Sequence, residues 1–245
     1  MKKIYVIGSA NTDMVVKTEF LPGPGETVLG GTFFMNAGGK GANQAVAAAR
    51  LGGDVVFVGR VGDDIFGKQT IEGLQKEKID TRFVSEDREN PSGTALITVN
   101  AEGENCIVVA PGANSKLNAA HLPDLREAEI ILMQLEIPIE TIEAAAAKAK
   151  EHQQRVNINP APAQPLSDVL LKDLFLITPN ETEADHLTGV SVNDKLTARK
   201  AAEVLLRKGV QHVIITMGKQ GAYYKSEDKE LMIDAPVVEV LDTTA

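Results

Sequence analysis

Residues 36–43 read Asn-Ala-Gly-Gly-Lys-Gly-Ala-Asn, with three glycines in four positions. Glycine lets the backbone approach a ligand closely and adopt a positive φ. The N–H groups that begin the Ala-rich helix expected next would face that ligand, and the helix dipole there favours negative charge. Lys40 adds a cation, while Asn36 and Asn43 add neutral donors and acceptors. The combination suits an oxygen-rich phosphate, carboxylate or sugar, although a plain Gly-rich connector has the same composition.

Other polar side chains follow short apolar runs that are typical of buried strands. Asn11 and Asp13 are expected in a loop after the first such run, and Glu136 follows the run at 130–135. Because the carboxyl ends of parallel strands share one edge of a sheet, these groups are expected to converge with Lys40. An Asx turn explains Asn11 and Asp13 equally well, and a charge that serves the next helix explains Glu136.

A further group of polar residues follows two later apolar runs. Asn180 and Glu183 lie three residues apart at the expected start of a helix. They can order a hydrated Mg²⁺ there, or simply cap the helix. Residues 216–221 resemble a second close-approach loop suited to phosphates, with an ordinary turn as the alternative. No Walker A motif occurs, because Gly41 rather than Ser or Thr follows Lys40.

The elements that must position these groups alternate between apolar strands and helices along most of the chain. This pattern predicts an α/β fold with a doubly wound, mostly parallel sheet covered on both faces. Two strand pairs without an intervening helix interrupt the pattern and indicate antiparallel pairing in a small projecting sheet. We therefore expect one α/β domain over residues 1–245, with the strands of the small sheet inserted at about 14–35 and 92–109.

Composition narrows the class of partner. The net charge of -9, without a basic stripe, argues against nucleic-acid binding. The single cysteine, Cys106, excludes an intrachain disulfide and fits a reducing cytoplasm. The apolar run near Met1 is too short for a signal peptide, and no run approaches the roughly 20 residues of a membrane span. We expect a cytoplasmic protein that binds small molecules, with no membrane partner.

The motifs together resemble the ribokinase family of carbohydrate kinases over the whole chain. In order, they are residues 8–13, 38–45, Glu136, 180–183, 216–221 and 242–244. Many sugar and nucleoside kinases of this family lack the counterparts of Lys40 and Gly41, so these two residues favour its ribose-phosphorylating members. The resemblance implies a ribokinase-like fold. It also implies ATP-dependent phosphorylation of D-ribose at the 5-hydroxyl, which gives D-ribose 5-phosphate.

The same resemblance implies roles for individual residues. The sugar would be held by Asn11, Asp13, Gly39, Lys40, Asn43 and Glu136. The nucleotide would lie along Asn180, Thr216, Gly218 and Gly221. Glu183 would order Mg²⁺ through water, and Asp242 and Thr244 would belong to a K⁺ site. The small sheet would be a lid over the sugar, and two lids would pair to make a homodimer.

One departure from the family concerns its Ala-Gly-Asp segment, which follows Asp-Thr-Thr-Ala and supplies the catalytic base and an anion hole. The sequence stops at Ala245 and contains no such segment. We expect the chain as given to be a C-terminally incomplete kinase that is nearly inactive alone. The alternatives are a kinase of this family for another sugar or a nucleoside, a non-catalytic sugar- or nucleotide-binding protein, and a structural domain that only dimerises.

Overall fold

The computed structural model describes residues 3–236, which form two sheets and six α-helices with short 3-10 turns. The strands of the main sheet are β1 (Lys3–Ile7), β4 (Asp54–Gly62), β5 (Asp80–Asp87), β8 (Ala128–Met133), β9 (Arg155–Ile158), β10 (Leu176–Ile177), β11 (His212–Thr216), β12 (Ala222–Ser226) and β13 (Glu230–Ile233). The helices are α1 (Lys40–Arg50), α2 (Ile65–Lys76), α3 (Ile139–Glu151), α4 (Asp168–Lys172), α5 (Glu181–Thr188) and α6 (Lys195–Arg207). The 3-10 turns are η1 (Gly112–Lys116), η2 (Ala119–His121) and η3 (Gly218–Gln220).

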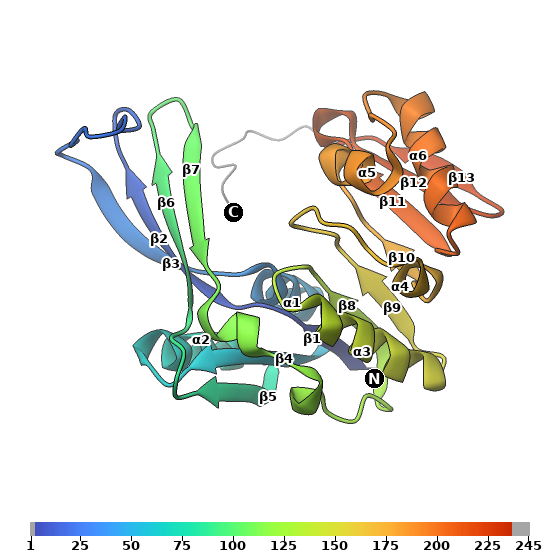
Figure 1. Cartoon of the computed structure of the whole chain (residues 1–245), viewed down its shortest axis with the longest axis horizontal. Helices are drawn as coiled ribbons and strands as arrows, with labels where there is room; N and C mark the ends of the chain where they lie inside the picture. Colours follow the sequence, from blue (N-terminus) through green and yellow to red (C-terminus); the bar gives the residue numbers. More distant parts are fainter. Residues whose placement is uncertain (1–2, 237–245) are drawn as a thin grey trace.

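The main sheet has the strand order β13-β12-β11-β10-β9-β8-β1-β4-β5 (Figure 1). Every pair from β11 to β5 is parallel, and only β12 and β13 are added antiparallel at one edge. The prediction of a mostly parallel α/β sheet is thus confirmed. The two antiparallel edge strands were not anticipated.

Helices cover both faces of this sheet, which explains why residues 4–7 of β1 are all apolar. Tyr5 and Ile7 join the core that also contains residues of α3, α4, α5 and α6. Val6 points to the opposite face and joins the core formed with α1 and α2. Successive side chains of a strand alternate between faces, so a strand buried on both sides needs an uninterrupted apolar run.

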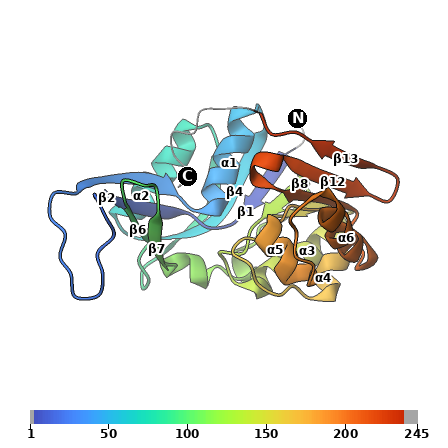
Figure 2. The ribbon, with the colours of Figure 1, turned by 90° about the horizontal axis from the view of Figure 1, so that it is seen from above.

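The second sheet projects from the main body (Figures 1 and 2). It consists of β2 (Asn11–Lys17), β3 (Thr32–Gly38), β6 (Gly93–Val99) and β7 (Asn105–Ala110), in the order β3-β2-β6-β7. As expected, β2 pairs antiparallel with β3, and β6 with β7. One face packs around a small apolar core, whereas β7 is exposed along its whole length.

Two strand boundaries differ from the sequence prediction in a way that matters for the site. Asn11 and Asp13 lie in β2 rather than in a loop, because Asn11 pairs with Gly38 on one side and Gly93 on the other. β3 likewise continues through residues 36–38 instead of ending at Met35. Asn, Ala and Gly are weak strand formers, and here pairing with β2 overrides that local preference.

None of the helices within residues 3–236 combines the length and the apolar character needed to cross a membrane.

Candidate functional site

Glu136, just beyond β8, connects three separate parts of the chain. Its Oε2 accepts a hydrogen bond from Ser9 Oγ at 2.6 Å and another from Lys40 N at 3.0 Å. Ser9 follows β1, which pairs in parallel with β8, and Lys40 begins α1. The carboxylate therefore lies at the N-terminus of α1, where the helix dipole stabilises negative charge.

The N–H groups at the start of α1 face the protein itself. Lys40 N donates to Glu136, while Gly41 N donates to Ser9 Oγ at 3.4 Å and Ala42 N donates to Ser9 O at 2.9 Å. The expectation that these groups face a ligand is wrong, because the segment after β1 folds over the helix start. Within residues 3–236, Glu136 Oε1 and the Lys40 ammonium have no hydrogen-bond or ion-pair partner. These two groups remain available to a ligand.

The three glycines of the motif are required by close contacts inside the protein. A Cβ on Gly41 would lie 2.7 Å from the main chain of Ser9. Gly39 has a φ of 89°, which disfavours other residues, and a Cβ there would lie 2.7 Å from the β1–β2 connection. A Cβ on Gly38 would overlap the carboxylate of Asp13. The glycines thus let β2, β3 and α1 meet, a purpose that the sequence pattern does not reveal.

The carboxylate of Asp13 lies over Gly38 and within electrostatic range of the Glu136 carboxylate. Partial burial raises the pKa of the Asp13 carboxyl, and the negative charge of Glu136 raises it further. Repulsion between two neighbouring carboxylates costs free energy. Because such an arrangement persists where function requires it, such pairs are concentrated at functional sites. Both oxygens of an ionised carboxylate accept hydrogen bonds, which suits a ligand with several hydroxyl groups.

Asn11 and Asp13 lie two residues apart on β2, so their side chains share one face of the strand. Asn11 is buried, and its Oδ1 accepts a hydrogen bond from Asn114 Nδ2 at 2.8 Å. The structure thus gathers Asn11, Asp13, Gly39, Lys40 and Glu136, with Asn43 exposed on the first turn of α1.

Sequence reasoning assigned no role to Ser9 or Asn114. Both are buried, and each donates a hydrogen bond to a residue of this group. Ser9 bonds to Glu136, and Asn114 bonds to Asn11. Asn114 belongs to a short 3-10 turn without hydrophobic periodicity, so no local signal could have identified it.

The residues predicted to contact a nucleotide line a separate pocket. Asn180, Thr216, Gly218 and Gly221 all border an open cavity of about 560 Å³. Asn180 and Thr216 form a parallel bridge just beyond β10 and β11, which themselves pair in parallel. Four residues spread over 42 positions (180 to 221) are thereby brought together at the carboxyl edge of the main sheet.

Glu183 and Asn180 cap α5. Glu183 N donates to Asn180 Oδ1 at 2.8 Å, while Asn180 N and Nδ2 donate to the Glu183 carboxylate at 2.9 and 3.1 Å. The capping alternative considered from the sequence is therefore confirmed. No cluster of three or more His, Cys, Asp or Glu residues suited to a metal occurs in the described part of the chain. Asp242 and Thr244, expected at a K⁺ site, lie outside it.

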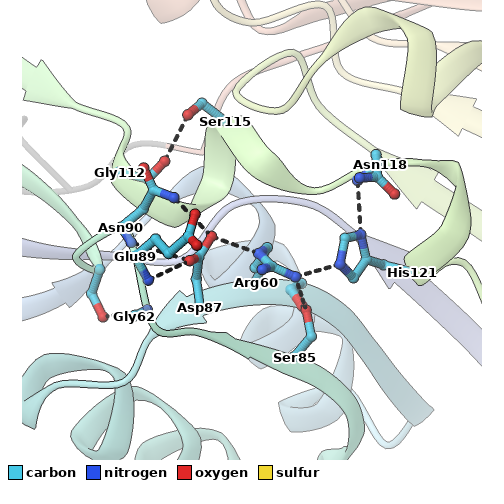
Figure 3. A network of polar contacts seen from close by, with 12 residues as sticks. Arg60, Gly62, Ser85, Asp87, Glu89, Asn90, Gly112, Ser115, Asn118 and His121 are labelled. Carbon is cyan, nitrogen blue, oxygen red and sulfur yellow. Dashed lines mark hydrogen bonds and ion pairs between the residues drawn. The ribbon is translucent and has the colours of Figure 1, made fainter.

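A larger cavity, of about 1170 Å³, is lined by none of the predicted site residues. Figure 3 shows its polar network, in which Arg60 contacts His121 and donates from Nε to Asp87 at 2.9 Å. Asp87 also accepts hydrogen bonds from Glu89 and Asn90, and these contacts, led by Arg60, hold its pKa well below the usual range. Arg60 and Asp87 neutralise each other, and their ion pair ties β4 to β5. Despite its larger volume, this cavity is therefore not the candidate site.

The chain is similar in sequence and in fold to known carbohydrate kinases. The model of the pfkB family carbohydrate kinases matches residues 1–245. A ribokinase of Haemophilus influenzae is 43% identical over 248 residues, covering 100% of this chain and 81% of the relative. A deoxyribokinase of Salmonella typhi is 40% identical over 248 residues, covering 98% and 80%. The structure of an Arabidopsis thaliana ribokinase complexed with ribose and ATP has a TM-score of 0.89 at 31% identity, covering 99% of this chain and 81% of that one.

Proposed function

The chain belongs to the pfkB family of carbohydrate kinases, and on this premise we propose that it phosphorylates D-ribose with ATP to give D-ribose 5-phosphate. The observation that carries the proposal is the pair of interacting carboxylates of Asp13 and Glu136, of which Glu136 accepts a hydrogen bond from Lys40 N at the start of α1. The complex of an Arabidopsis thaliana ribokinase with ribose and ATP supports the same choice of ligands.

In this proposal the sugar lies between β2 and the start of α1. Asp13 and Glu136 Oε1 accept hydrogen bonds from sugar hydroxyls, while Lys40 and Asn43 donate to sugar oxygens. Gly39 is proposed to contact the sugar through its main chain, since the protein itself occupies the space where a side chain would stand. Phosphoryl transfer depends mainly on positioning, so this fixed set of donors and acceptors would contribute by aligning the acceptor hydroxyl.

ATP is proposed to lie along Asn180, Thr216, Gly218 and Gly221. β8, which leads to the sugar group, and β11, which leads to the nucleotide pocket, are separated by β9 and β10. Three strand spacings amount to roughly 15 Å along the sheet edge. The adenosine and the sugar would therefore lie apart, with the phosphates directed from one toward the other.

Mg²⁺ and K⁺ are part of the proposal as well. Mg²⁺ would offset the negative charge of the phosphates. Glu183 suits such an ion only through an intervening water, because Asn180 already donates to both of its carboxylate oxygens. The K⁺ site at Asp242 and Thr244 rests on the resemblance alone.

The second sheet is proposed to act as a lid and as a dimer interface. β2 starts at the sugar group with Asn11 and Asp13, so movement of the sheet would open or cover it. β7 exposes Ile107, Val108 and Val109, and such adjacent apolar residues favour pairing with a second copy. We also propose a cytoplasmic location, which suits an exposed, unpaired Cys106.

Calorimetric titration of the 245-residue chain tests the function. D-ribose is expected to bind more tightly than 2-deoxy-D-ribose, D-fructose or adenosine, and ATP is expected to bind independently. Preference for another sugar or for adenosine would assign a different substrate within the family. If the chain binds neither D-ribose nor ATP, the proposal is refuted.

Asn180 offers a test of the nucleotide pocket with an internal control. Asn180→Ala and Asp194→Ala each remove a capping box, at α5 and α6 respectively, and each should lower the free energy of unfolding by about 1 kcal/mol. Only Asn180 lines the pocket, so only its replacement should weaken ATP binding. Urea denaturation and ATP titration of both variants provide the comparison, and equal ATP affinities would remove Asn180 from the nucleotide site.

A further inference from the structure

Asn114 lies in η1 and is only 1% exposed, yet it bonds directly to the connection between β1 and β2. Ala10 N donates to Asn114 Oδ1 at 3.0 Å. Asn114 Nδ2 donates to Ala10 O at 3.1 Å and to Asn11 Oδ1 at 2.8 Å. These contacts occupy both N–H groups of the Asn114 amide. Asn114 is therefore bonded to the protein and does not itself face a ligand.

The orientation of these two amides follows from the main chain of Ala10. A main-chain N–H can only donate and a carbonyl can only accept, so Asn114 must present Oδ1 to Ala10 N and Nδ2 to Ala10 O. Asn114 Nδ2 then also requires an acceptor on Asn11, which must be Oδ1. The polarity of the main chain is thus transmitted through Asn114 to Asn11, and the Asn11 amide has only one favourable orientation.

This orientation leaves Asn11 Nδ2 as the atom available to a ligand. Within residues 3–236 it donates no hydrogen bond, and it is not among the fully enclosed polar atoms without a partner. We infer that Asn114 is a positioning residue that fixes Asn11 as a hydrogen-bond donor toward the sugar. The inference rests on the proposed function, in which Asn11 contacts the sugar beside Asp13.

Gly93 provides independent support, because it leaves the space that the paired amides need. It is the first residue of β6 and lies opposite Asn11 in the parallel pairing of β2 and β6. A Cβ at this position would overlap both Asn11 Oδ1 and Asn114 Nδ2. Gly93→Ala should therefore separate the two amides without removing either of them.

A double-mutant cycle tests the inference by titration of D-ribose. Asn11→Ala and Asn114→Ala are each expected to weaken ribose binding about tenfold, the upper end for one neutral hydrogen bond. The double variant should bind about as weakly as either single variant, because Asn114 acts only through Asn11. Asn114→Asp keeps the size and the acceptor for Ala10 N but cannot donate, so it should lose affinity as well. Gly93→Ala should do the same if Asn114→Ala fails to fold.

Thermal unfolding and a matched control separate positioning from a merely structural role. Asn118→Ala replaces an exposed asparagine that caps η2 in the same region, and should leave the ribose affinity unchanged. If Asn114→Ala lowers the melting temperature but binds ribose normally, or if the losses in the double variant multiply, the inference is overturned. If the wild-type chain does not bind ribose at all, the proposed function fails instead.

Discussion

Asp13→Asn is expected to weaken D-ribose binding by about a hundredfold, near the upper end for loss of a hydrogen bond to a charged group. The substitution keeps the shape of the side chain over Gly38 but removes the charge. An amide offers only one acceptor oxygen and places a donor where the sugar presents hydroxyl hydrogens. Within residues 3–236 the Asp13 carboxylate makes no hydrogen bond, so no contact inside the protein would offset the loss of its bonds to the sugar.

The same substitution should stabilise the unliganded protein at neutral pH. Burial and the charge of Glu136 raise the pKa of Asp13 above its ordinary value of 3.8. The folded state then binds more protons than the unfolded state, so this group lowers stability as pH rises through the interval above 3.8. The ionised Asp13 therefore lowers the free energy of unfolding at neutral pH, whereas an uncharged asparagine at this position does not. Affinity for the sugar should fall on acidification in that same interval, as Asp13 becomes protonated.

Ribose titrations and melting temperatures of both proteins across an acidic to neutral series provide the measurement. Asp228→Asn, an exposed position in the turn between β12 and β13, is the control and should change neither quantity. A variant that binds ribose normally would exclude Asp13 from the sugar site. A variant less stable than wild type at neutral pH would contradict the electrostatic argument.

Gly41→Ala is expected to lower the free energy of unfolding by about 3 kcal/mol. Gly41 lies in the first turn of α1, where alanine is the better helix former by up to about 1 kcal/mol. A Cβ there would nevertheless lie 2.7 Å from both the N and the O of Ser9, so α1 or the β1–β2 connection must move. Because Ser9 and Lys40 N hold Glu136, such a shift should also weaken ribose binding.

Gly73→Ala is the matched control for that prediction. Gly73 also lies within a helix, α2, but nothing lies within 4 Å of a Cβ added to it. This substitution should stabilise the protein by up to about 1 kcal/mol. Urea denaturation of the two variants compares the effects, and similar changes for both would show that α1 does not lie as close to Ser9 as described.

Much of the fold was predictable because its strands are short apolar runs separated by helices. Glu136 was also recognisable, since a carboxylate three residues after the end of β8 must meet polar groups at the sheet edge. The residues expected to hold the sugar are gathered beside β2 and α1, whereas those expected along the nucleotide line a separate pocket. The sequence signal was strong at these points because each residue is both locally conspicuous and at the end of a regular element.

The remainder depends on contacts between distant segments. The extension of β2 back to Asn11 results from pairing with Gly38 and Gly93, which no local pattern encodes. The N–H groups of α1 looked free in the sequence, yet they bond to Ser9 and Glu136, which are remote from them along the chain. Asn114 shows the same limit, because its importance lies entirely in its bonds to residues more than 100 positions away.

The central claim is that D-ribose binds between Asp13, Lys40 and Glu136, and a crystal structure of the chain with D-ribose tests it most directly. The account predicts sugar hydroxyls within hydrogen-bond distance of Asp13 and Glu136, with Lys40 on the same ligand. Ribose bound instead in the larger cavity beside Arg60 and His121, with the Asp13 region unoccupied, would contradict it.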